Sequence, residues 1–331
     1  MFHLSFVMKK FQTIIFILLI IVVGLFFVVK FEDGFIHAGL EILSRDPSTS
    51  SSPPVGGLDS DRDDILDNII VTFLDIGQGD ATFLRFPNGE TMLVDCAKDA
   101  RVLEALGRVI PFYENSIDTL VVTHPDSDHY GGCIDVMKRF TVHTIVYNGL
   151  QKKGDTYWES FWQEIENEQV SGATFVQLER ETVWNIASTT VDFLYPDHDV
   201  TKNANVPRTT HNEDNNTSVV MKVSVGDQDV LLTGDMETPL EEYLVATYGD
   251  ALDVEVLKVG HHGSGSSSGQ EFLDVVQPDI AIISVGEKNS YGHPSLRVLK
   301  RLERAGAEIH RTDQGGDITL TIASSSVFVG E

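Results

Sequence analysis

Side chains that can bind metal ions are concentrated in residues 123–129, which read Thr-His-Pro-Asp-Ser-Asp-His. The candidate ligands in this segment are His124, Asp126, Asp128 and His129. They follow residues 118–122, whose apolar character predicts a strand. In an extended chain residues 124, 126 and 128 point the same way, and His129 can turn toward them as the chain enters two glycines. One turn can therefore supply ligands to two adjacent metal ions. The alternative is a plain polar loop, but burying so many titratable side chains together is costly without cations to pair them.

Two further segments carry candidate ligands directly after predicted strands. Asp235 follows residues 230–234, and a carboxylate at a strand end can bridge two cations with its two oxygens. His261 and His262 follow the apolar run 254–259 and are flanked by glycines, which let the backbone approach a site closely. Each histidine alone would suggest an ordinary surface or core position. Together with residues 123–129 they favour a shared metal site.

The beginning of the chain predicts a membrane anchor. Residues 14–29 contain no polar side chain and, with the residues before them, approach the roughly 20 residues that span a bilayer. Lys9 and Lys10 precede this run, which favours a cytoplasmic N-terminus. We expect an uncleaved signal anchor over residues 1–30, with a transmembrane helix at about 11–29. The alternatives are a cleaved signal peptide, which would make the protein secreted, and a buried core helix. The anchor predicts a single-pass protein of the cell membrane whose remaining chain is extracytoplasmic.

The rest of the 331 residues divides into a linker and one domain. Residues 31–64, rich in Ser, Asp and Pro, predict a flexible tether, and residues 65–331 contain no second linker. Within this domain the expected strands are 68–76, 81–86, 91–96, 118–123, 191–194, 218–225, 229–233, 254–259, 280–285 and 318–322. The expected helices are 101–108, 135–140, 156–168, 239–247, 270–276 and 294–305. Strands in two groups, each followed by helices, predict an α/β fold with a two-sheet core.

Charge limits the partners of this domain. Lys and Arg total 24 against 50 Asp and Glu, which gives a formal net charge of −26. A broad basic surface that would bind an extended duplex is therefore excluded, and any polyanion has to be bound locally. The sequence indicates no protein partner.

Short motifs along the chain carry a resemblance to a known family. They are residues 73–81, 93–95, 124–132, 215–218, 231–235, 257–264, 291–295 and 311–313. In these motifs the chain resembles the metallo-β-lactamase superfamily and, within it, the hydrolase domain at the C-terminus of the ComEC family of DNA-internalisation competence proteins. The resemblance covers residues 69–323 and implies a four-layer αββα sandwich with a dinuclear site at one end of the two sheets.

The resemblance also implies a ligand set for two divalent metal ions per chain. The implied ligands are His124 and Asp126 for the first ion, Asp128, His129 and His261 for the second, and Asp235 as a bridge. The superfamily's usual HxHxDH motif has histidine where this chain has Asp126, and a carboxylate there makes manganese a competitor to zinc. The superfamily also has a further histidine where this chain has Asn215, Asn216 and Ser218. His211 is a candidate substitute, with a solvated loop as the alternative.

The same resemblance suggests roles for the remaining candidates. A water or hydroxide between two cations would attack a phosphorus or a carbonyl carbon, with Asp128 counted among the catalytic residues. His262 and His293 are candidates for leaving-group protonation, and support of loop geometry is their alternative role. Six further residues are expected to bind substrate or orient the ligands: Asp75, Asp80, Asp95, Asn216, Ser218 and Ser264.

The sequence therefore predicts a membrane-anchored, metal-dependent phosphodiesterase or nuclease for short or single-stranded substrates. An ester, lactone or lactam hydrolase is the first alternative, because the same chemistry attacks carbonyls. A non-catalytic module of an envelope or DNA-uptake assembly is the second. The implied fold brings Cys96 and Cys133 to the same end of the core. We expect two small buried hydrophobic residues there, with a disulfide as the alternative in an exported domain.

Overall fold

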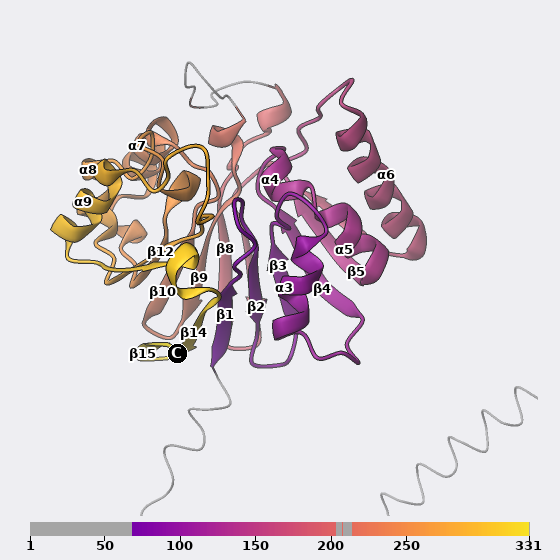
Figure 1. The fold of residues 1–331 in the computed structure, drawn as a ribbon, viewed down its shortest axis with the longest axis horizontal. Helices are drawn as coiled ribbons and strands as arrows, with labels where there is room; N and C mark the ends of the chain where they lie inside the picture. The colour runs from indigo at the N-terminus through magenta and orange to yellow at the C-terminus, as the bar shows by residue number, and fades with distance from the viewer. Residues whose placement is uncertain (1–67, 203–206, 208–213, 331) are drawn as a thin grey trace, which may run out of the picture. The chain divides into compact units, whose positions relative to one another are not determined.

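The computed structural model describes residues 68–202, 207 and 214–330, which are coloured in Figure 1. The expected signal anchor over residues 1–30 and the linker over residues 31–64 lie outside the described residues. Among the helices of the described part of the chain, none combines the length and the apolar character that a membrane span requires.

Two mixed β-sheets form the centre of the domain. The first has eight strands, in the spatial order β15 (Ser326–Val329), β14 (Ile318–Ala323), β1 (Ile69–Phe73), β2 (Thr82–Arg85), β3 (Thr91–Val94), β4 (Ser116–Val122), β5 (Thr141–Tyr147) and β6 (Thr174–Gln177). The second has seven, in the order β13 (Glu308–Arg311), β12 (Ile280–Ile283), β11 (Val256–Lys258), β10 (Gln228–Leu232), β9 (Val220–Val225), β8 (Thr189–Tyr195) and β7 (Thr182–Ile186). Strands β3 to β6 are parallel to one another, as are β10 to β13.

Helices cover the outer face of each sheet (Figure 1). Those on the first sheet are α3 (Arg101–Val109), α5 (Cys133–Arg139) and α6 (Thr156–Ser171), and those on the second are α7 (Thr238–Tyr248), α8 (Gln270–Val276) and α9 (Leu296–Ala305). The short helices are α4 (Ser127–Tyr130) and α10 (Thr312–Gly315), with 3₁₀ turns at Val200–Lys202, Asn215–Thr217, Gly249–Leu252 and Gly260–Gly263.

The core consists of three apolar layers, one between the sheets and one beneath each set of helices. Successive strand residues point to opposite faces, so one strand serves two layers. In β3, Met92 and Val94 belong to the layer between the sheets, whereas Leu93 belongs to the layer under α3 and α5. In β10, Leu231 likewise faces the helices while Val230 faces the other sheet. This layer order confirms the predicted αββα sandwich.

Five strands were absent from the elements expected from the sequence: β5, β6, β7, β13 and β15. Four of them form the outer edges of the two sheets, where few side chains are buried. An edge strand therefore has only a weak hydrophobic pattern. The fifth, β5, begins with alternating polar residues and is apolar only in its last part.

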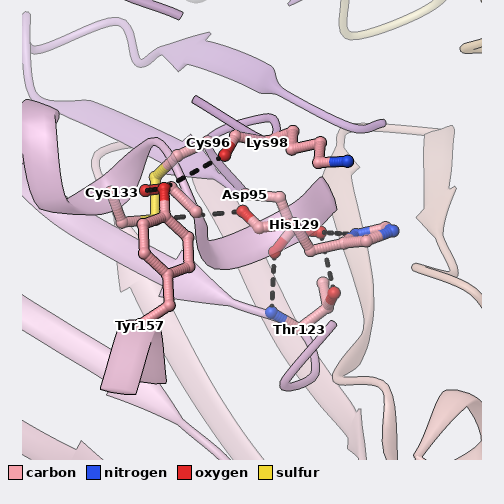
Figure 2. The surroundings of a disulfide bond; sticks show 8 residues. Asp95, Cys96, Lys98, Thr123, His129, Cys133 and Tyr157 are labelled. Atoms are coloured by element: carbon pink, nitrogen blue, oxygen red, sulfur yellow. Dashed lines mark hydrogen bonds and ion pairs between the residues drawn. A yellow bond between two sulfur atoms is a disulfide. The ribbon is translucent and has the colours of Figure 1, made fainter. Parts of the chain in front are cut away.

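A disulfide joins Cys96, just after β3, to Cys133 at the start of α5 (Figure 2). The expectation of two separate small hydrophobic residues is therefore wrong, although both cysteines are buried. The main chain between them is also connected, because the Cys96 N–H donates to the carbonyl of His129 at 2.7 Å. The disulfide and this hydrogen bond thus connect the loop after β3 to the segment that follows β4. Spacing along the chain did not reveal the pairing, because the fold alone brings these two loops together.

Candidate metal centre

Three loops, each following a strand, bring the candidate ligands together. They are residues 123–130 after β4, residues 233–236 after β10 and residues 259–264 after β11. Strand β4 belongs to the first sheet, whereas β10 and β11 are parallel neighbours in the second. The ligand atoms that lie within 4.8 Å of one another form four overlapping groups: His124, His129 and Asp235; Asp128, His129 and His262; Asp80, Asp235 and His262; and Asp80, Asp95 and His129. The site is therefore built at one end of both sheets.

Asp235 lies at the centre of this cluster. Its Oδ1 is 3.2 Å from Nε2 of His129, an approach that does not form a hydrogen bond. Its Oδ2 is 3.6 Å from Nε2 of His262 and 4.0 Å from Nε2 of His124. The Nε2 atom of His261 is 3.8 Å from the same oxygen. One carboxylate thus faces imidazoles contributed by both sheets.

Several polar atoms of the cluster are buried without a hydrogen-bond partner among the described residues. Four of them are Nε2 of His124, His129 and His262, and Oδ1 of Asp235, and a fifth is Oδ1 of Asp80. Burying one such group unpaired costs about 1–3 kcal/mol of folding stability. Four unpaired atoms aimed at one another would therefore destabilise the fold unless a ligand pairs them. Divalent cations would satisfy these atoms, since His124, His129 and Asp235 form one ligand group and His262 and Asp235 belong to another. Imidazole with carboxylate is a donor set that zinc and manganese accept. The residues therefore fit the metal that the fold implies.

The charges of the cluster also favour a cation. Burial would raise the pKa of Asp235, but the imidazoles of His129 and His262 hold that pKa well below its usual range. Burial would lower the pKa of His262, but the carboxylates of Asp235 and Asp80 raise it to about 10. The buried carboxylates thus stabilise positive charge on the imidazoles, and a metal ion can take the place of those protons.

Asp95 fixes the orientation of His129, as Figure 2 shows. The Nδ1–H of His129 donates to Oδ2 of Asp95 at 2.7 Å, which leaves Nε2 as the atom directed at Asp235. Asp95 also accepts hydrogen bonds from the main-chain N–H and the hydroxyl of Thr123, at 2.8 and 2.7 Å. That hydroxyl lies 3.0 Å from Nδ1 of the neighbouring His124. One buried carboxylate therefore organises both histidines of the β4 loop.

Asp80 and Lys258 support His262. Gly79, the residue before Asp80, packs so closely against the main chain of Asp128 that an added Cβ would collide with the Asp128 carbonyl oxygen. This close packing places Asp80 beside His262. Asp80 Oδ1 lies 3.4 Å from Nδ1 of His262, and its Oδ2 is 2.6 Å from Nζ of Lys258. On the other side of the ring, Nε2 of His262 is 3.5 Å from Oδ2 of Asp128. The Nδ1–H of His262 donates to the main-chain carbonyl of Ser284 at 3.0 Å, so that carbonyl holds the ring. The ring lies between two carboxylates, one of them neutralised by a buried lysine.

His261 has different surroundings from its neighbour. Its side chain is 25% exposed, and its Nδ1 is 3.1 Å from Oε1 of Glu237. Its ring centroid is 5.6 Å from that of His293. Burial and the nearby imidazole of His261 lower the pKa of His293 to about 4. Of the two adjacent histidines, His262 lies deep between carboxylates and His261 lies nearer the solvent.

Asp126 lies beside His124, and its side chain is 23% exposed. Its Oδ2 is 3.7 Å from Nε2 of His124, and its Oδ1 is 2.7 Å from Nζ of Lys152. Lys152 also lies 3.3 Å from Oδ2 of Asp214. Burial would raise the pKa of Asp126, but His124 and Lys152 hold it well below its usual range. The negative charge that aspartate adds at this position is thus compensated by a lysine.

The other residues singled out from the sequence lie at different distances from this cluster. Ser218 accepts the main-chain N–H of Asp235 at 3.1 Å, and Asn216 accepts that of Glu237 at 3.0 Å. The Ser264 hydroxyl lies 2.9 Å from that of Ser266 and accepts the main-chain N–H of Ser266 at 3.4 Å. Asp75 lies in an exposed turn and is outside the four ligand groups. His211 is outside the described residues.

Sequence reasoning missed three charged residues of the site: Lys152, Glu237 and Lys258. Lys258 carried a signal, because a lysine inside an apolar strand that runs into the histidine pair has to be buried and paired. Lys152 carried none, because a loop distant in sequence brings it to the site. Glu237 lies only two residues after Asp235, but a single glutamate before a helix has no pattern that marks it as a partner of His261.

A two-sheet sandwich with histidine and aspartate ligands gathered at one end of the sheets is the architecture of a metal-dependent hydrolase. The sequence profile of the metallo-beta-lactamase superfamily matches residues 74–287, so the chain belongs to that superfamily. This confirms the resemblance inferred from the motifs.

Within the superfamily the chain is similar to competence proteins. It is 31% identical over 265 residues to ComE operon protein 3 of Bacillus subtilis, a match covering 75% of this chain and 32% of the relative. It is 31% identical over 261 residues to competence protein ComA of Neisseria gonorrhoeae, covering 78% of this chain and 33% of that protein. The chain thus spans about a third of the length of these relatives. Among solved structures, the metallo hydrolase Igni18 of Ignicoccus hospitalis aligns with 76% of this chain and 98% of its own, at 12% identity and a TM-score of 0.48.

Proposed function

We propose that the chain is a dinuclear metal-dependent phosphodiesterase that cleaves nucleic acid. The observation that carries this proposal is the convergence of unpartnered buried imidazole and carboxylate atoms from both sheets on Asp235. The similarity to competence proteins, together with a recombination protein of Haemophilus influenzae at 30% identity over 254 residues, supports nucleic acid as the substrate.

The contacts support a specific division of the ligands. Asp235 faces both halves of the cluster and would be shared by two cations. Asp128, His129 and His262 would hold one cation, because their ligand atoms lie within 4.8 Å of one another. His124 and Asp126, whose Nε2 and Oδ2 atoms are 3.7 Å apart, would hold the other. His262 takes the ligand role that the family resemblance implies for His261.

A divalent cation bound there would act as a Lewis acid and lower the pKa of a coordinated water. The protein's own groups keep the ligands in place: Asp95 holds the His129 ring, and the Ser284 carbonyl holds the His262 ring. The more exposed His261 lies beside the cluster, where it can exchange a proton with a leaving oxygen, and Glu237 orients its ring. His293 is the second candidate for that transfer.

The location we propose is the extracytoplasmic side of the cell membrane, with residues 1–30 as the anchor. The disulfide between Cys96 and Cys133 supports export, because disulfides persist in oxidising compartments.

The test is an activity assay of the purified full chain with and without EDTA. Three substrates separate the reaction classes: bis-p-nitrophenyl phosphate, a labelled single-stranded oligonucleotide and a chromogenic lactam. We expect metal-dependent cleavage of both phosphodiesters. Asp235→Ala should abolish this cleavage, and Asp250→Ala, which removes an exposed carboxylate outside the cluster, should leave it unchanged. Turnover of the lactam without either phosphodiester would replace the proposal with a carbonyl hydrolase.

A further inference from the structure

A cavity of about 390 Å³ lies beside the ligand cluster, and Asp128 forms part of its wall. Four segments line it: residues 77–78 after β1, residues 98–101 before and at the start of α3, residues 127–128 in α4, and residues 286–291 after β12. Two of its walls pack closely, because a Cβ added at Gly286 would lie 2.7 Å from the main-chain nitrogen of Gln78. The cavity is therefore a built feature that adjoins the proposed site of cleavage.

The cavity is basic although the chain is strongly acidic. Three of its lining residues are Lys98, Arg101 and Lys288, in a chain whose net charge is −26. Neither lysine forms an ion pair with a carboxylate in the described part of the chain. Arg101 binds Asp99 through Nε and Nη2, while its Nη1 is directed toward Gly77 in the cavity wall.

The opposing charges in the same wall are fewer. The carboxylates that line the cavity are Asp128 and Glu287. Asp128 belongs to the ligand cluster, where a cation would neutralise it, and Glu287 is exposed. With metal present, the cavity therefore offers a net positive surface to an anion that reaches the cluster.

An aromatic side chain completes the cavity. Tyr291 is 69% exposed, and its ring is stacked on that of His293 with centroids 5.7 Å apart and planes at 13°. An exposed ring that is held flat against a second ring can stack with a nucleobase. Cationic side chains for the backbone together with an aromatic surface for a base are the combination by which proteins bind single strands.

We infer that this cavity binds the nucleotide next to the scissile phosphodiester of a single-stranded substrate. Lys98 and Lys288 contact its phosphate, and Tyr291 stacks on its base. This inference rests on the proposed function and narrows its substrate from any phosphodiester to a strand with at least one further nucleotide beyond the bond that is cut. It also explains how so acidic a protein binds a polyanion, since the contact is confined to one cavity.

The test measures binding rather than turnover, by fluorescence anisotropy of the metal-loaded full chain with a fluorescein-labelled thymidine hexanucleotide whose phosphorothioate linkages slow cleavage. Substitution of the lysines is expected to spare the fold, because Lys98 has a free side chain and its carbonyl, not its ammonium, accepts the Tyr157 hydroxyl (Figure 2). The double variant K98A/K288A should raise the dissociation constant about tenfold and lower the salt slope by about 0.7, the value for one neutralised single-strand phosphate.

Matched variants separate a specific site from a general loss of charge. Lys300→Ala removes an exposed lysine of α9 outside the cavity and should leave binding unchanged. Tyr291→Ala should weaken binding about fivefold or more, within the range for one lost base stack, while Tyr291→Phe should retain most of it.

Two outcomes overturn the inference: no measurable binding by the wild-type chain, or equal binding by K98A/K288A and Lys300→Ala. Neither result depends on catalysis. Failure of the wild-type chain to cleave bis-p-nitrophenyl phosphate with metal would instead overturn the proposed function, so the two failures are distinguishable.

Discussion

The two halves of the proposed metal centre are supported in different ways. In the half containing Asp128, Nδ1–H of His129 donates to the buried carboxylate of Asp95, and Nδ1–H of His262 donates to the Ser284 carbonyl, with the Asp80 carboxylate 3.4 Å away. In the other half, His124 is backed only by the hydroxyls of Thr123 and Ser218, at 3.0 and 3.4 Å.

The partners of the two halves also differ in charge. Lys258 neutralises Asp80 at a distance from the ligand atoms, whereas Lys152 binds the proposed ligand Asp126 directly. A carboxylate behind a histidine raises its basicity as a ligand, and an ammonium group on a ligand opposes a cation. The half with Asp128 thus has three proposed ligands of its own against two, and its ligands also have the more favourable supporting charges. We expect the half with Asp128 to bind its ion more tightly.

The largest loss of phosphodiester cleavage is expected from replacing Asp235, the residue that the two halves share. Asp235→Ala removes the carboxylate that both share, so phosphodiester cleavage should fall to the level seen in EDTA while the circular dichroism spectrum stays that of a folded protein. Asp128→Ala should give the same loss of cleavage. Full activity in both variants would show that the cluster is not the site of the reaction.

The adjacent histidines provide the next test. His262→Ala should remove the tighter ion and most of the activity, because His262 lies between Asp80 and Asp128. His261→Ala should retain both ions and lose activity through impaired proton transfer. Metal analysis of the two variants side by side measures this difference, and the reverse result would restore His261 as the ligand.

A smaller effect is expected from the support behind His129. Asp95→Asn keeps the shape of the side chain but removes the charge that holds Nδ1–H, and such changes reduce metal affinity about 10- to 100-fold. Ser218→Ala, behind His124, should cost less. Competition with a fluorescent zinc chelator gives both affinities, and equal losses would remove the distinction between the halves.

The smallest effect should come from Lys152. Lys152→Met removes a positive charge beside the proposed weaker ion, so the affinity for that ion should rise about two- to tenfold, as expected for a partly exposed charge. Lys153→Met, in the exposed neighbouring residue, is the matched control and should change nothing. A fall in affinity on Lys152→Met would mean that the lysine stabilises the ligand geometry instead of opposing the cation.

The sequence predicted the parts of the site that lie close together along the chain. Residues 124–129 form one motif after a buried strand, and their spacing alone indicated a shared site. The apolar strands of the sheet interiors were predicted for the same reason, because they carry strong local patterns.

The rest depended on tertiary structure. Lys152 supports the site only once distant loops meet, and the partner of the buried Lys258, Asp80, follows a strand of the other sheet. His261 and His262 both have positive φ, 47° and 52°, so the alternation of an extended chain does not tell which of them faces the cluster.

Metal stoichiometry of the full chain tests the central claim most directly. The protein should be purified without added ions and titrated with zinc or manganese, with bound metal measured by mass spectrometry. The account predicts two ions per chain of unequal affinity, and loss of the tighter one in His262→Ala. A chain that binds no divalent ion, or that binds the same number in Asp235→Ala as in the wild type, would contradict it.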